Sequence, residues 1–446
     1  MISIANDSNV RPWKRALGWL AFLGPFFFLT YGLTNTWTSR LSDVESIVFD
    51  WEKHIPFLAW TILPYMSIDA FYALSLFICK TSTELDTHGK RLLSATLISI
   101  AGFLLFPLKF SFDRPATEGF NGMLFDVLTG FDKPFNQAPS LHISLLMLLW
   151  VKYARHMRGK LAWFLHCWFA LIGLSVFTTY QHHVIDGVTG IIVGVVCFYL
   201  FPDLPVSTRE KVVSHVRCKR SSMLQLYYLI ASGICFAFAF SIKGWAWLML
   251  WPGISFLLVS LAYAYFGVRI FQKHEGKLSW SAYALLWPYH TAAWFSSRCF
   301  TRHIDPCVEV VPGVWIGRIP SHADLEHGKP QAVLDLTAEF HSSPTVRSLH
   351  YRSVPMMDLI MPSLVQLREA VDCLDALYSY PPVLVHCALG YSRSALVIAS
   401  WLLHRKLADT PENAIAMIRN ARPQIVLSSF SLAVLDTFYH EHIKRV

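Results

Sequence analysis

The sequence predicts a protein of two parts: an all-α polytopic bundle of membrane helices over residues 1–300 and an α/β domain over residues 301–446. Three observations predict this. Of the 446 residues, 54% are hydrophobic and only 15% are charged, against roughly 25% charged residues in an ordinary soluble protein. Apolar runs near the length of a membrane span recur through the first part. The second part alternates short apolar runs with segments of helical periodicity, which is typical of an α/β domain.

We expect eight spanning helices in the first part. They are predicted at 16–34, 55–79, 92–108, 141–154, 161–180, 184–201, 224–242 and 245–267. The segment 278–296 is apolar and aromatic but also contains Ser and His, so we expect an interfacial helix there, with a ninth span as the alternative. The predicted domains are two sets of transmembrane helices (1–90 and 202–300) around a membrane core (91–201), followed by the domain 301–446.

The distribution of charge predicts the orientation. With the N-terminus in the cytoplasm, 19 of the 25 Lys and Arg residues of the first part fall in inner segments. An even number of spans then places the second part in the cytoplasm. No basic run with interleaved aromatic residues indicates nucleic acid binding. The nine cysteines form no CxxC pair, so we expect no zinc site.

The second part is predicted as alternating strands and helices. The strands are expected at 308–317, 331–337, 349–358 and 381–387, and the helices at 363–380, 392–406 and 410–421. Thr410 followed by Pro411 is a typical helix start. The resulting domain is long enough to bury its own core.

Three short motifs of the first part are expected on its outer face: Lys109 to Pro115, Pro139 to His142, and His182 to Asp186. Phosphoryl transfer needs cations for the phosphate oxygens, a nucleophile, and an acid for the leaving group. Arg114, His182 and His142 can fill these roles, and Asp186 can orient His182 if both lie on one helix face. An isolated interfacial His is more often a polar anchor, and we interpret His183 as structural. The coincidence of three motifs on one face favours function.

These motifs resemble the type-2 phosphatidic acid phosphatase superfamily over about residues 90–200. The resemblance implies a six-helix membrane core that acts through a phosphohistidine. It implies a phosphate-binding role for Arg114 and Lys109, support from Ser140, an acid role for His142, a nucleophile role for His182, and Asp186 as the partner of His182.

Two departures from the family pattern matter. Lys109 stands closer to the Arg-Pro pair than the lysine of the family does, and Val176 occupies the position of a further Arg. Sequences with these departures are similar to the inositol phosphorylceramide synthase-like branch of the superfamily, which contains sphingolipid head-group transferases. Transfer to an alcohol therefore stays open beside transfer to water.

The run from Val385 to Ser394, VHCALGYSRS, predicts a second centre. A strand delivers Cys387 to a loop, and a helix begins where the loop ends, so that backbone N–H groups can bind a phosphate dianion. The positive electrostatic potential of the same N–H groups favours the thiolate form of Cys387. Arg393 can clamp two phosphate oxygens, Gly390 permits tight curvature, and Ser394 can donate a hydrogen bond to the departing sulfur. A buried Cys with a surface Arg is the alternative, but it does not explain the preceding strand and the following helix.

This run resembles the protein tyrosine and dual-specificity phosphatase family over most of 305–446. The resemblance implies a phosphocysteine intermediate and a general acid on a separate loop. Asp358, at the end of a predicted strand and 29 residues before Cys387, stands where the family keeps that acid. A helix cap or turn carboxylate is the alternative. Neither centre is expected to need a metal or another cofactor.

Together the two resemblances predict a multi-pass protein of a bacterial inner membrane, a fusion of a lipid phosphatase with a cytoplasmic cysteine phosphatase. We expect it to contact membrane lipids and to act on a phosphorylated lipid or a phosphoprotein. One alternative is a head-group phosphotransferase outside with a protein phosphatase inside. Another is a non-catalytic, phosphate-binding membrane scaffold. The sequence indicates no oligomeric state.

Overall fold

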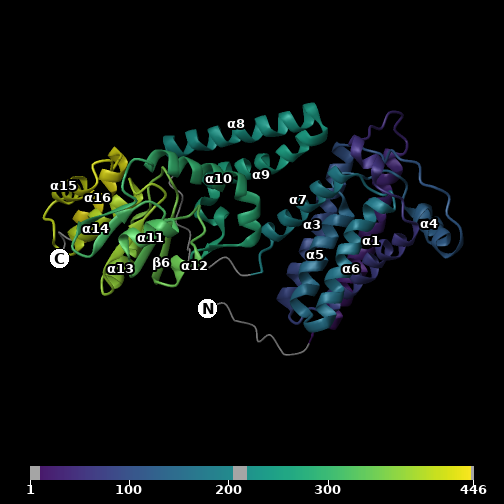
Figure 1. The fold of residues 1–446 in the computed structure, drawn as a ribbon, viewed down its shortest axis with the longest axis horizontal. Coiled ribbons are helices and arrows are strands. Elements are labelled where there is room, and N and C mark those ends of the chain that lie inside the picture. Colours follow the sequence, from purple (N-terminus) through teal and green to yellow (C-terminus); the bar gives the residue numbers. More distant parts are fainter. Residues whose placement is uncertain (1–10, 204–217, 443–446) are drawn as a thin grey trace. The chain divides into compact units, whose positions relative to one another are not determined.

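A computed structural model describes residues 11–203 and 218–442 (Figure 1). Three of the basic residues predicted on the inner side, Arg209, Lys211 and Arg217, lie outside the described residues. The chain divides into two compact units, one of Met1–Leu204 with Cys235–Trp251 and one of Pro205–Ile234 with Pro252–Val446. Residues 252–300, predicted as part of the membrane helices and their linker, thus belong to the same unit as the α/β domain.

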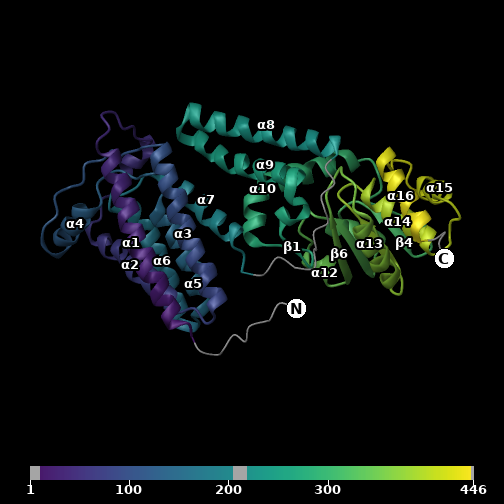
Figure 2. The ribbon, with the colours of Figure 1, turned by 180° about the vertical axis from the view of Figure 1, so that it is seen from behind.

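The first unit is helical. Its helices are α1 (Trp13–Thr38), α2 (Ile62–Phe77), α3 (Ser82–Leu105), α4 (Gly119–Phe131), α5 (Leu141–His156), α6 (Gly159–Thr178) and α7 (Val184–Leu200), with short 3-10 turns η1 (Asp50–His54), η2 (Ala59–Thr61) and η3 (Gly244–Met249). Helices α3, α5 and α7 lie side by side in Figures 1 and 2. Their facing side chains form a buried apolar core.

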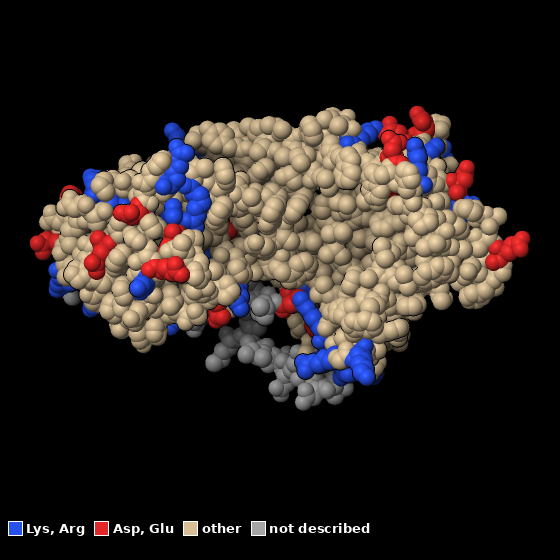
Figure 3. All heavy atoms as spheres, in the orientation of Figure 1, with Lys and Arg blue, Asp and Glu red and all other residues tan. Residues whose placement is uncertain are grey.

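Four helical stretches in the described chain are long and apolar enough to cross a membrane. They are α1, α6, α8 (Lys219–Ile242) and the continuous stretch Gly244–Phe271. Over the length of α8 the surface carries almost only uncharged side chains (Figure 3). The other predicted spans are helices of 16 to 24 residues that are shorter or more polar, so their insertion stays a prediction.

The predicted span 245–267 is not one regular helix. It passes from η3 through α9 (Leu250–Leu261) and a π-helix, η4 (Ala262–Phe266), to a 3-10 turn, η5 (Gly267–Phe271). Gly244 and Gly267 both have positive φ, a conformation that glycine adopts without steric cost and that interrupts a regular helix. The stretch therefore changes its helical pitch before it reaches the domain.

Glycines let α5 and α7 approach closely. A Cβ at Gly190 would lie 2.5 Å from the Ser140 carbonyl oxygen. In its absence the Ser144 hydroxyl donates to the Gly190 carbonyl at 2.9 Å, and the Ser140 N–H donates to the Asp186 carbonyl at 3.0 Å. This packing brings the second outer motif against the third.

The second unit contains a five-stranded sheet, one strand more than predicted, because the segment 308–317 forms two strands joined by a turn at Pro312 and Gly313. Its strands are β3 (Cys307–Val311), β4 (Val314–Gly317), β5 (Ala332–Thr337), β6 (His350–Met356) and β7 (Val383–His386), in the order β3-β4-β7-β5-β6. Strands β4, β7, β5 and β6 run parallel, and β3 is antiparallel to β4. The central position of β7 buries it completely.

The predicted helices of this unit are confirmed as α13 (Leu364–Leu377), α14 (Arg393–His404) and α15 (Pro411–Ala421). The Thr410 hydroxyl caps α15 by accepting from the Asn413 N–H. Three further helices were not predicted: α11 (His322–Gly328), α12 (Pro344–Arg347) and α16 (Ser429–His442). Two of these are short, and short helices leave little periodicity in a sequence.

Alternation along β5 and β7 divides the residues between the two faces of the sheet. Leu334 and Val385 join the core against α13 and α14. On the other face, Val333 and Leu384 form a smaller cluster near α11 and α12. Asp335 and His386 are partners in the register of β5 and β7.

A hairpin and a helix precede the sheet. The hairpin pairs β1 (Lys273–His274) with β2 (Lys277–Leu278), and α10 (Trp280–Thr301) covers the segment predicted as an interfacial helix. Its exposed side chains include Trp280, Tyr283, Trp287, Trp294, Phe295 and Phe300.

Candidate active sites

The loop after β7 surrounds the sulfur of Cys387 with donors. The Gly390 N–H donates to Cys387 Sγ at 3.2 Å, and the Ser394 hydroxyl lies 3.3 Å from it. Gly390 has φ +76°, and a Cβ there would lie 2.6 Å from the backbone of Gly317. Only glycine fits this turn without displacing β4, so the curvature predicted from the sequence is present.

These neighbours activate the thiol. Cys387 is only 3% exposed, and burial alone would raise the pKa of its thiol. The positive charge of Arg393 and the hydrogen bond from Ser394 outweigh burial and hold that pKa below its ordinary value. A thiolate is the nucleophilic form of cysteine.

Arg393 is fixed at the first position of α14. Its two terminal nitrogens donate to both carboxylate oxygens of Glu339, at 3.0 and 2.7 Å, and Nη1 also donates to the Met356 carbonyl. The buried Nε has no hydrogen-bond partner within the part of the chain that the structure describes. That N–H is placed to donate to a phosphate oxygen.

Asp358 lies beside the guanidinium, with Oδ1 3.0 Å from Arg393 Nη2, and its side chain is 33% exposed. Burial raises the pKa of the Asp358 carboxyl above its ordinary value, although Arg393 opposes the shift. A raised pKa favours the protonated carboxyl that a general acid needs. The structure therefore brings Cys387, Arg393 and Asp358 together.

Glu339 is the residue that the sequence analysis missed. Its side chain is buried and holds the guanidinium in two hydrogen bonds. A signal was present, because Glu339, Asp358 and Cys387 each follow one of three adjacent parallel strands, β5, β6 and β7. The carboxyl ends of parallel strands meet at one edge of a sheet, where sites form.

Residues outside the strands tie down the rim of the loop. The Ser297 hydroxyl of α10 donates to the Ala388 carbonyl at 2.7 Å, and Arg422 Nη2 donates to the Leu389 carbonyl at 3.3 Å. The Tyr391 hydroxyl donates to the carbonyl of Phe300. Helix α10 is therefore part of the support of this site.

The outer motifs also converge. His182 Nδ1 lies 3.6 Å from Asp186 Oδ2, on the first turn of α7. The ring of His142 lies near His182 and stacks on Tyr65 at 4.2 Å between centroids. The Arg114 guanidinium lies near the same tyrosine. One region of the first unit thus holds His142, His182, Asp186 and Arg114.

Other outer residues have different surroundings. Lys109 is exposed, and its ammonium forms no ion pair within the described residues. Ser140 is buried and caps α5 by accepting from the Ile143 N–H. Position 176, where the family pattern has an Arg, holds a fully buried valine and therefore supplies no cation.

His183 has the surroundings of a structural residue. Its Nδ1 lies 3.1 Å from Glu52 Oε2, and its Nε2 faces the Ser111 hydroxyl at 3.0 Å. Both ring nitrogens are therefore occupied.

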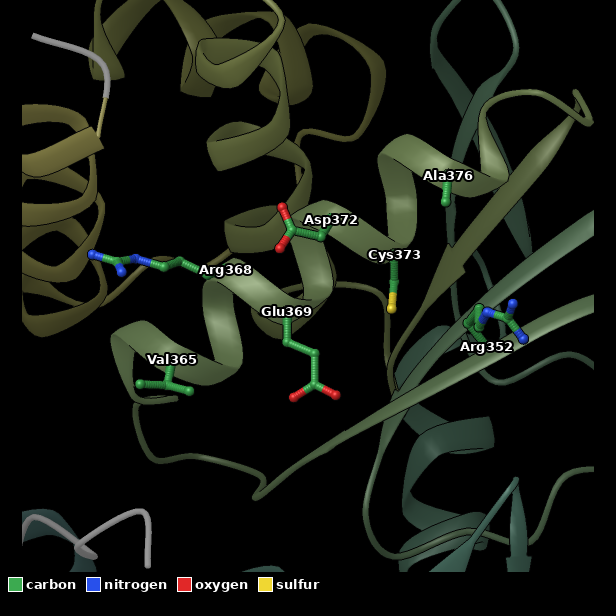
Figure 4. Close-up of a pocket in the computed structure, with 7 residues that line it drawn as sticks. All are labelled: Arg352, Val365, Arg368, Glu369, Asp372, Cys373 and Ala376. Carbon is green, nitrogen blue, oxygen red and sulfur yellow. The ribbon is translucent and has the colours of Figure 1, made fainter. Parts of the chain in front are cut away.

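Two cavities of the second unit contain none of the predicted site residues. One of about 440 Å³ lies along α13 and β6 and is lined by Arg352, Val365, Arg368, Glu369, Asp372, Cys373 and Ala376 (Figure 4). One of about 370 Å³ lies between α10 and the domain, with His290 and His386 on its wall. In the described residues no group of three His, Cys, Asp or Glu side chains could hold a metal ion.

The family model of the dual specificity phosphatase catalytic domain matches residues 314–438. Residues 314–438 form a catalytic domain of the dual-specificity phosphatase type. The C-terminal prediction is thereby confirmed at this level, and the phosphatidic acid phosphatase resemblance of residues 90–200 stays a prediction.

Several solved structures are similar to this chain. Tk-PTP in its active form is 24% identical, with a TM-score of 0.28, over 30% of this chain and 97% of that chain. PTPMT1 in complex with PI(5)P is 22% identical, with a TM-score of 0.29, over 32% and 99%. Human DUSP28 is 19% identical, with a TM-score of 0.29, over 31% and 99%.

Proposed function

We propose that the C-terminal domain hydrolyses a phosphomonoester through a phosphocysteine, and that its substrate is a membrane lipid. The observation that carries the reaction is the contact of Arg393 with both Glu339 and Asp358 beside an activated Cys387. Cys387 Sγ attacks phosphorus as the bond to the leaving oxygen breaks, and Asp358 gives that oxygen its proton.

A second step releases phosphate. Water attacks the phosphorus of the thiophosphate and gives a proton to Asp358, while the S–P bond breaks and the sulfur leaves as a thiolate. The Ser394 hydroxyl, 3.3 Å from the sulfur, stabilises that thiolate. The enzyme returns to its starting protonation state.

The choice of substrate rests on charge and on exposed aromatic surface. The five residues between Cys387 and Arg393 include no basic residue, so additional phosphates on a head group would lack cations there. Helix α10 presents exposed Trp and Phe side chains of the kind found at membrane interfaces. A lipid monophosphate is therefore the first choice and phosphotyrosine the second.

Catalytic efficiencies of the full-length protein in a His182→Ala background, which lacks the outer reaction proposed below, test this choice. We would compare phosphatidylglycerophosphate in vesicles, a phosphotyrosine peptide and an inositol trisphosphate lipid. The lipid monophosphate is expected to be preferred, and Cys387→Ser is expected to abolish all three activities. A clear preference for the inositol lipid would refute the charge argument.

For the first unit we propose a second centre that acts on a lipid phosphate with His182 as the nucleophile. The approach of His182 to Asp186, with His142 and Arg114 nearby, supports it. Position 176 holds a valine and no cation, so transfer of the phosphoryl-bearing head group to an alcohol is the alternative to hydrolysis. A scaffold that binds phosphate without turnover is the third candidate.

One experiment separates these three functions. The Cys387→Ser protein, which lacks the inner reaction, is incubated with lipid monophosphates with and without an alcohol acceptor. Free phosphate in the absence of acceptor indicates hydrolysis, and a phosphomonoester of the acceptor alcohol, formed together with the dephosphorylated lipid, indicates transfer. Binding without either product supports the scaffold.

We further propose that the protein resides in a bacterial inner membrane with the C-terminal domain in the cytoplasm. The excess of basic residues in the expected inner segments supports this orientation. A reducing compartment also keeps Cys387 a thiol. A reporter fused after Val446 should be active in the cytoplasm, and a periplasmic signal would mean that α10 spans the membrane.

A further inference from the structure

The segment that precedes α10 touches the loop that carries Asp358. The hydroxyl of Tyr263, in the π-helix η4, donates to the backbone carbonyl of Asp358 at 3.2 Å. Tyr263 is only 2% exposed. It lies outside residues 314–438, the range that matches the phosphatase family. π-Helical turns are rare and occur frequently at functional sites.

The carbonyl that Tyr263 holds belongs to a turn with an uncommon backbone. Leu359, the residue directly after Asp358, has φ +61°, and its side chain is 47% exposed. A non-glycine residue in this region stores strain and persists only where its surroundings hold it. The accepting carbonyl is part of the peptide unit that joins Asp358 to Leu359, so the phenol acts on the strained turn itself.

Neighbouring rings fix the position of Tyr263. The ring of Tyr228 stacks on it with centroids 5.7 Å apart and planes within 4°. Tyr289 of α10 meets Tyr228 edge to face at 5.8 Å. Three tyrosines from three helical segments thus form one cluster, and such aromatic pairs stabilise their arrangement beyond the burial of area.

A buried ion pair anchors the same segment ten residues further on. Lys273 Nζ donates to Asp335 Oδ2 at 2.8 Å, and both side chains are 1% exposed. It also donates to the carbonyl and the hydroxyl of Thr337. Because these contacts lie at the end of β5, the segment is attached to the strand next to the one that leads to Cys387.

We propose that Tyr263 is a positioning residue of the cysteine phosphatase reaction: its hydroxyl holds the strained turn at Asp358 so that the carboxyl stays beside Arg393, within reach of the leaving oxygen. The proposal rests on the proposed function of Asp358 as the general acid. It assigns a role in catalysis to a helical segment that precedes the phosphatase-type domain.

The test uses two substrates that differ in their need for an acid. Full-length Tyr263→Phe in detergent, in a His182→Ala background that lacks the outer reaction, is assayed with two substrates. One is a lipid phosphate, whose alkyl leaving group needs a proton, and the other is an aryl phosphate, whose leaving group departs unprotonated. We expect kcat/KM on the lipid phosphate, which reports the first step alone, to fall roughly threefold to tenfold, the range expected for one neutral hydrogen bond. We expect kcat/KM on the aryl phosphate to stay unchanged. Retained aryl phosphatase activity also demonstrates that the variant is folded.

Controls distinguish positioning from a general structural effect. Tyr265→Phe, a change in the same π-helix at a largely exposed ring, should leave both rates unchanged. In an Asp358→Asn background, Tyr263→Phe should cause no further loss. The basic limb of the pH–rate profile should move in Tyr263→Phe, because that limb reports the proton of Asp358.

Three results would overturn the proposal, and the first two are distinguishable from the third. An equal loss on both substrates, or a loss that persists in Asp358→Asn, would give Tyr263 a purely structural role and leave the acid role of Asp358 intact. If Asp358→Asn itself loses activity equally on both substrates, the acid assignment fails and the role of Tyr263 fails with it.

Discussion

Replacing Lys273 with Met should destabilise the second unit strongly. The ammonium is buried with Asp335, and the substitution leaves that carboxylate without its counter-charge. Removing one partner of a buried ion pair costs about 3–5 kcal/mol. Asp335 keeps hydrogen bonds from Thr337, Ser342 and Tyr351, so we expect the lower end of that range, about 3 kcal/mol. For a unit of this size the loss corresponds to a fall in Tm of roughly 6–12 °C.

Thermal unfolding of the full-length protein in detergent, followed by tryptophan fluorescence, measures the loss. Lys277→Met is the matched control, because Lys277 is an exposed lysine on the other strand of the same hairpin. The double variant Lys273→Met/Asp335→Asn should recover part of the lost stability, since no buried charge is then left unpaired. A fall in Tm no larger than that of Lys277→Met would refute the reasoning.

The dependence of stability on pH provides an independent test of the ion pair between Lys273 and Asp335. Burial alone would raise the pKa of Asp335, but Lys273 and the neighbouring donors hold it well below its ordinary value. A carboxyl with a depressed folded-state pKa contributes stability that is present above its unfolded pKa and is lost as the pH falls through the folded value. Without Lys273 the folded pKa rises, so acid destabilisation should begin at higher pH in Lys273→Met than in the native protein.

Three further predictions concern turnover. The rate of the cysteine phosphatase reaction should show a bell-shaped dependence on pH. The acid limb should lie below the usual pKa of a thiol, because Arg393 lowers the pKa of Cys387. The basic limb should disappear in Asp358→Asn. Arg393→Lys should lower kcat by about 10²-fold or more, since an ammonium cannot reproduce the planar clamp; a loss below tenfold would contradict it. At the outer centre, assayed as metal-independent lipid phosphate turnover in a Cys387→Ser background, His182→Ala should abolish activity and His183→Ala should retain much of it; the reverse would mean that our choice of nucleophile is wrong.

The sequence was most informative where a local pattern determines the structure. Short apolar runs predicted β5 and β7, and Thr410 with Pro411 predicted the start of α15. The loop at Cys387 was predictable because its glycine, its arginine and the following helix lie within one short run. The family match to residues 314–438 agrees with that interpretation.

The partners that come from a distance were not predictable. Glu339 follows a predicted strand, but it precedes Arg393 by 54 residues, and only the order of the strands brings the two side chains together. Lys273 is one of the 19 basic residues that the sequence places in inner segments, whereas the structure buries its side chain with Asp335. Both cases depend on the order of the strands, which a single sequence leaves undetermined.

The boundary of the catalytic unit shows why composition and packing can disagree. Composition changes near residue 300, because the helices before it expose apolar side chains and the domain after it exposes charged ones. Contacts do not change there: Tyr263, Lys273 and Ser297 all bond to residues at the carboxyl edge of the sheet or in the loop at Cys387. The composition of a segment reflects whether its outer face contacts lipid or water, whereas its packing shows which other segments it stabilises. A helical segment can therefore be apolar on its outer face and still support the chemistry of the domain that follows it, which is the arrangement expected of an enzyme whose substrate is a lipid.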